Sequence, residues 1–313
     1  MAERVLLTGA GGFVGRALGE RLIRAGFAVR GVSRRPNALT EIYHDTVPLP
    51  DQPAKEEAWA PLLSGVDHVV HCAGIAHATA EIPREAYMAV NAELTGALAR
   101  AAAEHIRGRF VFVSSIRAMS GPVSEAVLRD DTPPEPQDDY GRSKLAGERL
   151  VGAAFAGGGL HTILRPVLIY GPGVKGNLGA LARLASSPFP LPIAGLSAKR
   201  SLLDAESLAE AVILLLGTKR AATGPFIACD RRPVTVAEIV AAMRKGSGRR
   251  PMLFAVPDAL LAAPLRLAGR GEAWRRLAGP LVARAEGLEA LGWRPAEDAA
   301  DRIAQYSAGE RRG

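Results

Sequence analysis

The chain has 313 residues and a formal net charge of +7, and its 48 % hydrophobic and 23 % charged residues are typical of a soluble globular protein with one large domain or two modest ones. The apolar opening is too short for a signal peptide, and the longest later apolar run, Ala209 to Gly217, is too short to span a bilayer. We therefore expect a cytoplasmic protein. Scattered arginines and few aromatic residues argue against nucleic acid as a partner.

Strand-like and helix-like runs alternate through the first half of the chain. We predict strands in 4–9, 28–33, 67–74, 109–115 and 161–171, and helices in 13–26, 84–105 and 140–156. This alternation predicts an α/β fold with a Rossmann-like, doubly wound parallel sheet. Stretches rich in glycine and proline follow Tyr170 and indicate a smaller C-terminal substrate-binding region. We assign 1–169 to a dinucleotide-binding domain to which 205–230 returns, and 170–204 and 231–313 to the smaller region.

A glycine-rich loop joins the first predicted strand to the first predicted helix. Gly9, Gly12 and Gly15 have the spacing G-x-x-G-x-x-G in the stretch TGAGGFVG. The first glycine permits a tight turn, the second a close approach to a pyrophosphate, and the third close packing of helix on strand. The helix begins at Phe13 and Val14 and directs free N–H groups at the phosphates. The loop therefore predicts a dinucleotide site that these five residues contact.

The end of the second predicted strand, in the stretch GVSRR, indicates which dinucleotide is bound. A NAD site has an acidic residue here for the ribose 2′-hydroxyl, whereas this chain has Ser33 followed by Arg34 and Arg35. A guanidinium suits a 2′-phosphate, which a carboxylate would repel. We predict that Ser33 and Arg34 contact the cofactor and that NADPH is preferred to NADH, with NAD as the alternative. Two solvated loop arginines are the competing interpretation.

The stretch YGRSKLAGE places Tyr140 and Lys144 one helical turn apart, so that a phenol and an ammonium share one helix face. A free phenol, with a pKa of about 10, exchanges protons poorly near neutrality, and a neighbouring ammonium favours its ionised form. The pair predicts a proton donor for the alkoxide that hydride transfer to a ketone leaves. A helix pair on the surface without a catalytic role is the competing interpretation.

These stretches occur in order with HCAG, VNAELTG, FVFVSS, LRPVLIYGPG and RSLLDAESLA along nearly the whole chain. The chain thereby resembles the extended short-chain dehydrogenase/reductase family, in its nucleotide-sugar epimerase/dehydratase branch. The resemblance implies that Tyr140 exchanges the proton and that Lys144 also binds the nicotinamide ribose. It further implies that Ser115 donates a hydrogen bond to the substrate oxygen, because its spacing to Tyr140 matches that of the family. Ser114 competes for this role.

The resemblance also implies cofactor contacts outside the glycine loop and the predicted helix 140–156. These contacts are Cys72, Ala73 and Gly74 in HCAG, Asn91 in VNAELTG, and Pro166 in LRPVLIYGPG. An asparagine side chain satisfied by nearby backbone is the alternative for Asn91. We expect His71 to be a packed core histidine without a chemical role.

Two positions and one absence concern the substrate. Asn177 and Arg200 resemble residues that hold the nucleotide diphosphate in relatives, and a guanidinium can bind a diphosphate bidentately. A surface salt bridge is the alternative for Arg200. Related sugar 4,6-dehydratases have an Asp-Glu pair directly after the active-site Ser or Thr, where this chain has Ile116 and Arg117. This absence argues against dehydration and leaves redox chemistry at a sugar carbon.

Three functions follow from the resemblance. FVFVSSI, PPEPQDDYGRSK and LRPVLIYGPGVKGN look most like bacterial reductases of UDP-4-keto-6-deoxy-N-acetylhexosamines, which favours an NADPH-dependent 4-keto reductase. A UDP-sugar 4-epimerase with tightly bound NAD is the alternative, weakened because Ser120-Gly121 stands where a Tyr-Gly pair is usual. A non-catalytic dinucleotide-binding regulator is the third interpretation, although such proteins usually lack the Tyr or the Lys.

The remaining histidines and cysteines predict neither a metal site nor a disulfide. His68 and His71 are three residues apart on a predicted strand and therefore point to opposite faces of it. Cys72 and Cys229 lie in strand-like runs, where we expect two small buried hydrophobic side chains.

Two helical features concern larger partners. The arginine-rich stretch 264–284 is interrupted by glycines, so we expect no stable membrane association. The alanine-rich segments 91–105 and 141–156 permit close helix packing, and relatives pair these two helices across a two-fold axis. We therefore expect a homodimer.

Overall fold

The computed structural model describes residues 2–76, 82–174, 176–218, 222–267, 269 and 271–309. Its strands are β1 (Arg4–Thr8), β2 (Ala28–Ser33), β3 (Asp45–Pro48), β4 (His68–His71), β5 (Arg109–Val113), β6 (Ser124–Leu128), β7 (Leu160–Pro166), β8 (Leu168–Tyr170), β9 (Lys199–Arg200), β10 (Leu202–Asp204), β11 (Pro225–Ala228), β12 (Val234–Thr235) and β13 (Leu281–Ala283). Its α-helices are α1 (Phe13–Arg24), α2 (Ala60–Leu63), α3 (Arg84–Met88), α4 (Leu94–His105), α5 (Asp139–Ala154), α6 (Gly176–Ala185), α7 (Ala205–Gly217), α8 (Val236–Gly246), α9 (Asp258–Leu267), α10 (Gly271–Ala278), α11 (Glu286–Ala290) and α12 (Ala299–Gly309).

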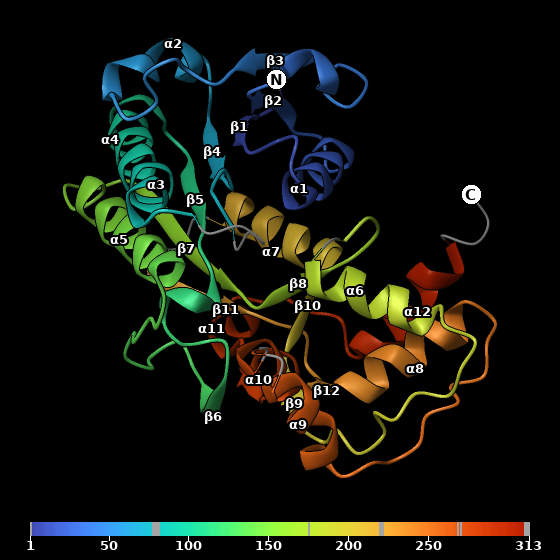
Figure 1. Ribbon diagram of the computed structural model, residues 1–313. Helices are drawn as coiled ribbons and strands as arrows, with labels where there is room; N and C mark the ends of the chain where they lie inside the picture. Colours follow the sequence, from blue (N-terminus) through green and yellow to red (C-terminus); the bar gives the residue numbers. More distant parts are fainter. Residues whose placement is uncertain are drawn as a thin grey trace.

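Seven parallel strands form the main sheet, in the order β11-β7-β5-β4-β1-β2-β3. Helices α3, α4 and α5 lie on one side of the sheet, and α1 and α7 lie on the other (Figure 1). All residues of β5 are buried, because both faces of the sheet are covered. The Rossmann-like, doubly wound sheet predicted from the sequence is confirmed. The order reverses between β1 and β4, and ligands bind such sheets at this reversal, outside the carboxyl ends of the strands.

The long helix predicted for 84–105 is divided. It consists of α3, one turn of π-helix at Ala89–Glu93, and α4. A π-turn widens a helix locally and is often found at functional sites. Here the turn contains Asn91, one of the predicted cofactor contacts.

The smaller region lies below the main sheet in Figure 1 and has its own buried core. It contains a four-stranded sheet in the order β12-β9-β13-β6, and helix α8 packs against α12. Strand β6 joins this sheet although it precedes α5 in the chain. Helix α7 packs on α1, and β11 pairs with β7 at the edge of the main sheet.

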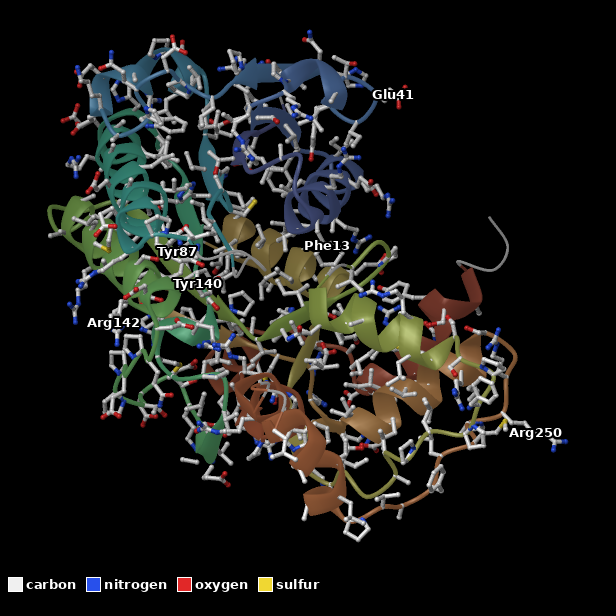
Figure 2. All side chains as sticks on the ribbon, in the orientation of Figure 1. Phe13, Glu41, Tyr87, Tyr140, Arg142 and Arg250 are labelled. Carbon is white, nitrogen blue, oxygen red and sulfur yellow. The ribbon has the colours of Figure 1, made fainter. Side chains whose placement is uncertain are left out.

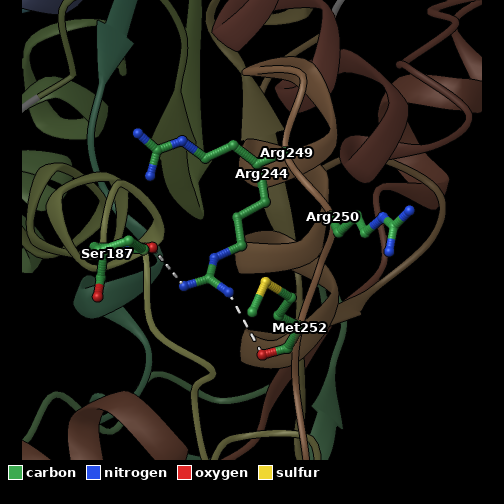
Figure 3. Close-up of a pocket in the computed structure, with 6 residues that line it drawn as sticks. Ser187, Arg244, Arg249, Arg250 and Met252 are labelled. Carbon is green, nitrogen blue, oxygen red and sulfur yellow. Dashed lines mark hydrogen bonds between the residues drawn. The ribbon is translucent and has the colours of Figure 1, made fainter.

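Arg244 of α8 organises the loops at the far end of the smaller region. Its buried guanidinium donates hydrogen bonds to the carbonyls of Ser187, at 2.9 Å, and Met252, at 3.4 Å (Figure 3). The hollow beside it has a volume of about 300 Å³, with Arg249 and Arg250 among its lining residues. Because the N–H groups of Arg244 donate their hydrogen bonds to backbone carbonyls, we interpret this arginine as structural.

The stretch 264–284 is divided among the end of α9, α10 and β13. Within the ranges described, no helix has both the length and the apolar character needed to cross a bilayer. The homodimer expected from the alanine-rich helices stays a prediction.

Candidate active site

The glycine loop forms a cradle between β1 and α1. Gly9 has a φ of 70°, and a Cβ added there would lie 2.7 Å from the backbone nitrogen of Ala73. A Cβ on Gly15 would lie 2.1 Å from the carbonyl oxygen of Gly9, so only glycine permits this approach of helix to loop. Gly12 caps α1 without a side-chain hydrogen bond, and the first turn of α1 has no acidic residue. The open helix N-terminus therefore fits a phosphate.

Two further loops adjoin the cradle. A Cβ on Gly171, just after β8, would lie 3.6 Å from the ring of Phe13, so the YGPG loop faces the start of α1. Val14, the next residue, packs against the main hydrophobic core. Pro166 is buried at the end of β7, where it pairs in register with Ala228.

The end of β2 places Ser33 beside the glycine loop and leaves Arg34 exposed. The Ser33 hydroxyl lies near the glycine loop, 3.4 Å from a Cβ built on Gly11, and it accepts a hydrogen bond of 3.1 Å from the Arg35 N–H. The Arg34 side chain is exposed and forms no salt bridge with another described residue. Its guanidinium is thus available to an anion that lies against the end of β2.

His71 is a neutral residue of the core and has the surroundings of a structural side chain. Its ring is fully buried, with Nδ1 2.6 Å from the Thr8 hydroxyl and Nε2 2.9 Å from the Thr95 hydroxyl. It also stacks on Phe112, with ring centroids 5.4 Å apart. Burial, with a contribution from the Lys144 charge, lowers the pKa of His71 to about 3. The expected packed histidine agrees with this geometry.

Cys72 and Cys229 are free thiols in the structure. Burial raises the pKa of each to about 12, so neither is a thiolate near neutral pH. The Cys72 sulfur donates to the carbonyl of Thr8, which fixes the start of the loop that contains Ala73 and Gly74. Among the residues that the structure describes, no cluster of side chains could hold a metal ion.

Asn91 connects the loop after β4 to helix α5 through hydrogen bonds. Its fully buried side chain accepts a hydrogen bond of 2.8 Å from the Ile75 N–H and donates one of 3.0 Å each to the Ile75 carbonyl and the Ser143 hydroxyl. A Cβ on Gly74 would lie 2.8 Å from the Asn91 carbonyl oxygen and 3.4 Å from the Lys144 ammonium. The side chain is thus satisfied within the protein, where it holds the backbone of Ile75 against α5. Contact of Asn91 with a cofactor stays a prediction.

Helix α5 presents Tyr140 in its first turn. Asp138 caps this helix, because its carboxylate accepts a hydrogen bond of 2.8 Å from the Gly141 N–H. The Tyr140 ring lies 6.1 Å, centroid to centroid, from the ring of Tyr87 on α3, and Figure 2 shows the two side by side. Burial raises the pKa of Tyr140, whereas a hydrogen bond with Ser115 and the charge of Arg117 lower it.

Lys144 follows Tyr140 by one turn, but its ammonium has partners of its own. It donates a hydrogen bond of 3.0 Å to the Val113 carbonyl and lies 4.7 Å from the centre of the Phe112 ring. Burial lowers the pKa of Lys144 to about 8. The charge of Arg117 also lowers the pKa of Tyr140. The tuning of the phenol by Lys144 stays a prediction.

Two adjacent serines competed for the role beside Tyr140, and they face different partners. The Ser114 hydroxyl donates a hydrogen bond of 2.6 Å to the Glu148 carboxylate, which is itself paired with Arg165 in the core. The Ser115 hydroxyl accepts the Arg117 N–H at 3.2 Å and hydrogen-bonds with the Tyr140 side chain. The geometry therefore favours Ser115 as the serine that meets a substrate oxygen.

Matched alanine variants of the two serines separate these roles. We expect Ser115→Ala to lower kcat by about 100-fold, because it removes the hydroxyl beside the phenol. We expect Ser114→Ala to lower the free energy of unfolding by ~1–3 kcal/mol, because the buried Glu148 carboxylate loses a donor. Steady-state kinetics and urea unfolding of both variants measure the two effects. A larger loss of kcat in Ser114→Ala would reverse the assignment.

The two predicted substrate residues lie in the smaller region. Arg200 of β9 is half-buried and donates to the carbonyls of Gly279, at 2.5 Å, and Pro122, at 3.1 Å. It forms no salt bridge to any other described residue, so the surface-salt-bridge alternative does not describe it. Burial and the nearby charge of Arg117 lower the pKa of Arg200. Asn177 is exposed at the start of α6.

Sequence reasoning missed two parts of this site. It used Arg117 only as evidence that a dehydratase acid pair is absent, and it did not consider the buried pair of Glu148 and Arg165. The available signal for the first was a cation two residues after Ser115. For the second it was an acid one turn beyond Lys144, on the same face of the helix.

The comparisons with known proteins agree with this geometry. Residues 5–227 match the model of the family described as "NAD dependent epimerase/dehydratase family". The chain is 31 % identical over 303 residues to "UDP-glucose 4-epimerase" of Vibrio cholerae, covering 94 % of this chain and 92 % of the relative. A "dTDP-4-dehydrorhamnose reductase" of Mycolicibacterium smegmatis is 34 % identical over 161 residues, covering 49 % of this chain and 43 % of the relative.

Among solved structures, "UDP-N-acetylglucosamine 4-epimerase from Bacillus cereus" superposes with a TM-score of 0.79. The superposition covers 100 % of both chains, at 21 % sequence identity, and so supports the fold. The match to the family model over most of the chain and the similarity to the Vibrio relative over nearly its full length give one answer. The chain belongs to the NAD-dependent epimerase/dehydratase family.

Proposed function

We propose that this protein is an NAD(P)-dependent oxidoreductase that reduces the 4-keto group of a UDP-linked 6-deoxy hexosamine with NADPH. The observation that carries the proposal is the hydrogen bond between Ser115 and Tyr140 at the start of α5. The loop at Ala73 and Gly74 lies between this helix and the glycine cradle, since a Cβ on Gly9 would lie 2.7 Å from the Ala73 nitrogen and one on Gly74 3.4 Å from the Lys144 ammonium. A proton donor and a dinucleotide cradle on neighbouring loops are what ketone reduction requires.

Each residue of the site has a role in this reaction. The cradle at Gly9, Gly12 and Gly15 would hold the pyrophosphate, and Lys144 would hold the nicotinamide ribose. The nicotinamide supplies the hydride when it is bound. Ser115 orients the carbonyl oxygen of the substrate, and Tyr140 gives its hydroxyl proton to that oxygen as negative charge develops on it.

Two observations support a reductase. The exposed guanidinium of Arg34 follows the end of β2, where it suits the 2′-phosphate of NADPH. Ile116 and Arg117 stand where a dehydratase would have two carboxyl groups for the elimination of water. In the smaller region, Arg200 and Asn177 would contact the diphosphate of the substrate.

A 4-epimerase is the second candidate, favoured by the name of the Vibrio relative. It would oxidise the sugar, let it rotate, and return the hydride to the other face with no net use of cofactor. Incubation of the purified protein with NADPH and a panel of UDP-sugars and UDP-4-keto-sugars decides between the two. Stoichiometric loss of NADPH absorbance indicates the reductase, and interconversion of epimers without loss indicates the epimerase. Cofactor binding with no turnover of any sugar would leave only the non-catalytic interpretation.

The cofactor preference can be tested at Arg34. We expect Arg34→Ala to weaken NADPH binding by about tenfold or more while NADH binding changes little, because only NADPH carries the phosphate. Arg24→Ala, at the end of α1, removes the same charge from a surface pair with Glu20 and serves as the control. Dissociation constants of both cofactors measure the ratio. A wild-type protein that binds NADH more tightly than NADPH would contradict the preference.

A further inference from the structure

A buried group of two tyrosines and two aspartates lies where the main sheet meets the smaller region. Tyr170 ends β8, and Asp204 ends β10 directly opposite it in register. Asp230 follows β11, and its N–H donates a hydrogen bond of 2.8 Å to the Leu202 carbonyl. Tyr306 belongs to α12, and its ring centroid lies 6.3 Å from that of Tyr170. Tyr170 and both aspartates are 2 % exposed or less, so bulk water does not reach their polar atoms.

Each of the two tyrosine hydroxyls donates to a different aspartate. The Tyr170 hydroxyl donates a hydrogen bond of 2.7 Å to Asp230 Oδ2, and the Tyr306 hydroxyl donates one of 2.7 Å to Asp204 Oδ1. The other oxygen of Asp230 accepts the Asp204 N–H at 3.2 Å. Within the described part of the chain, Asp204 has an ion pair with Arg302, at 3.6 Å, and Asp230 has none. Both oxygens of Asp230 therefore accept hydrogen bonds from the ends of the paired strands β8 and β10.

The loop that begins directly after Tyr170 adjoins the glycine cradle. Gly171 lies between two other segments, since a Cβ added there would lie 3.1 Å from the Ala205 Cβ and 3.6 Å from the Phe13 ring. Phe13 begins α1, the helix whose N-terminus fits a phosphate. The hydrogen bond from Tyr170 to Asp230 thus fixes the start of a loop that faces the first turn of α1.

We propose that Asp230 is a positioning residue for the dinucleotide, because through the Tyr170 hydroxyl it holds the loop at Gly171 against the start of α1 as one wall of the cofactor site. The inference rests on the proposed dinucleotide site and does not depend on which sugar reaction follows. A loop that is already held in place loses less conformational entropy when the cofactor binds, so binding is tighter. Without this hydrogen bond, the cofactor would have to order the loop as it binds.

Two variants that each remove one hydroxyl test this role. Tyr170→Phe removes the donor to Asp230, and Tyr306→Phe removes a donor at the same distance from the neighbouring Asp204. We expect Tyr170→Phe to weaken NADPH binding by about 5- to 20-fold and Tyr306→Phe by less than about twofold. Fluorescence titration of the full chain measures the dissociation constants, and urea unfolding measures the stability that each variant loses.

A third variant connects the effect to Asp230 itself. Asp230→Leu removes both acceptor oxygens at a similar side-chain size, and we expect it to weaken NADPH binding at least as much as Tyr170→Phe does. Adding Tyr170→Phe to Asp230→Leu should change the dissociation constant by less than about twofold, because the two residues act through one hydrogen bond.

A purely structural role predicts equal losses of stability in Tyr170→Phe and Tyr306→Phe with NADPH affinity unchanged in both, and that result would overturn the proposal. Equal losses of affinity in these two variants, or independent effects in the double variant with Asp230→Leu, would overturn it as well. A wild-type protein that binds neither NADPH nor NADH would contradict the proposed function together with this inference. Because the titration needs no sugar substrate, it decides the role of Asp230 even if the proposed reductase activity is not found.

Discussion

Replacing Tyr140 by phenylalanine is expected to lower turnover by about 1,000-fold and to leave cofactor affinity nearly unchanged. The ring remains and keeps its packing near Tyr87, but the substrate oxygen loses its proton donor. Steady-state kinetics with the sugar substrate and titration with NADPH measure the two quantities separately.

Tyr87→Phe is the matched control, since it removes the same atom from a ring 6.1 Å away. We expect its kcat to stay within about threefold of the wild type, as for a substitution outside the chemistry. A Tyr140→Phe variant that keeps a substantial part of wild-type turnover would remove the phenol from the mechanism, and with it the proposed reaction.

Breaking the buried ion pair beneath the site is expected to cause the largest loss of stability. Arg165 donates to the Glu148 carboxylate through Nε, at 3.0 Å, and Nη2, at 2.6 Å, and both side chains are 5 % exposed. Arg165→Met leaves the carboxylate buried, with the hydrogen bond of 2.6 Å from the Ser114 hydroxyl still in place. We expect the free energy of unfolding to fall by about 3–5 kcal/mol, measured by urea denaturation at pH 7.

Two comparisons separate burial from charge in this pair. The double variant Glu148→Gln, Arg165→Met removes both charges and should recover part of the loss, because no uncompensated ion is left in the core. The exposed pair of Arg129 and Glu286 provides the control, and Arg129→Met should cost less than ~1 kcal/mol. Equal effects at the buried and exposed pairs would contradict this account.

The parts of the fold that could be predicted are those set by local pattern. Continuous apolar runs such as 110–113 indicated buried parallel strands, and glycine spacing after β1 indicated the cradle. The helix that carries Tyr140 begins where the sequence predicted, within one residue. These signals depend on neighbours in the chain, which a single sequence displays directly.

The parts that could not be predicted depend on contacts between distant segments. Strand β6 has three exposed residues among its five and no strong apolar pattern, and it is a strand because β13, far along the chain, pairs with it. The contact of Arg117 with the start of α5 arises in the same way, through its ion pair with Asp138 and the packing of its carbonyl on Gly141. Periodicity within a segment contains no information on such contacts.

The placement of β6 gives the two halves of the protein a mechanical connection. The chain leaves the short turn Ile116–Ala118 after Ser115, passes Pro122, whose carbonyl accepts a hydrogen bond from Arg200, and enters the four-stranded sheet at Ser124. A ligand that bound Arg200 and displaced that sheet would therefore also displace the Ser115 hydroxyl, which lies only a few residues along the chain. Binding of one end of the substrate at Arg200 would then be coupled to the alignment of its other, reacting end at Ser115.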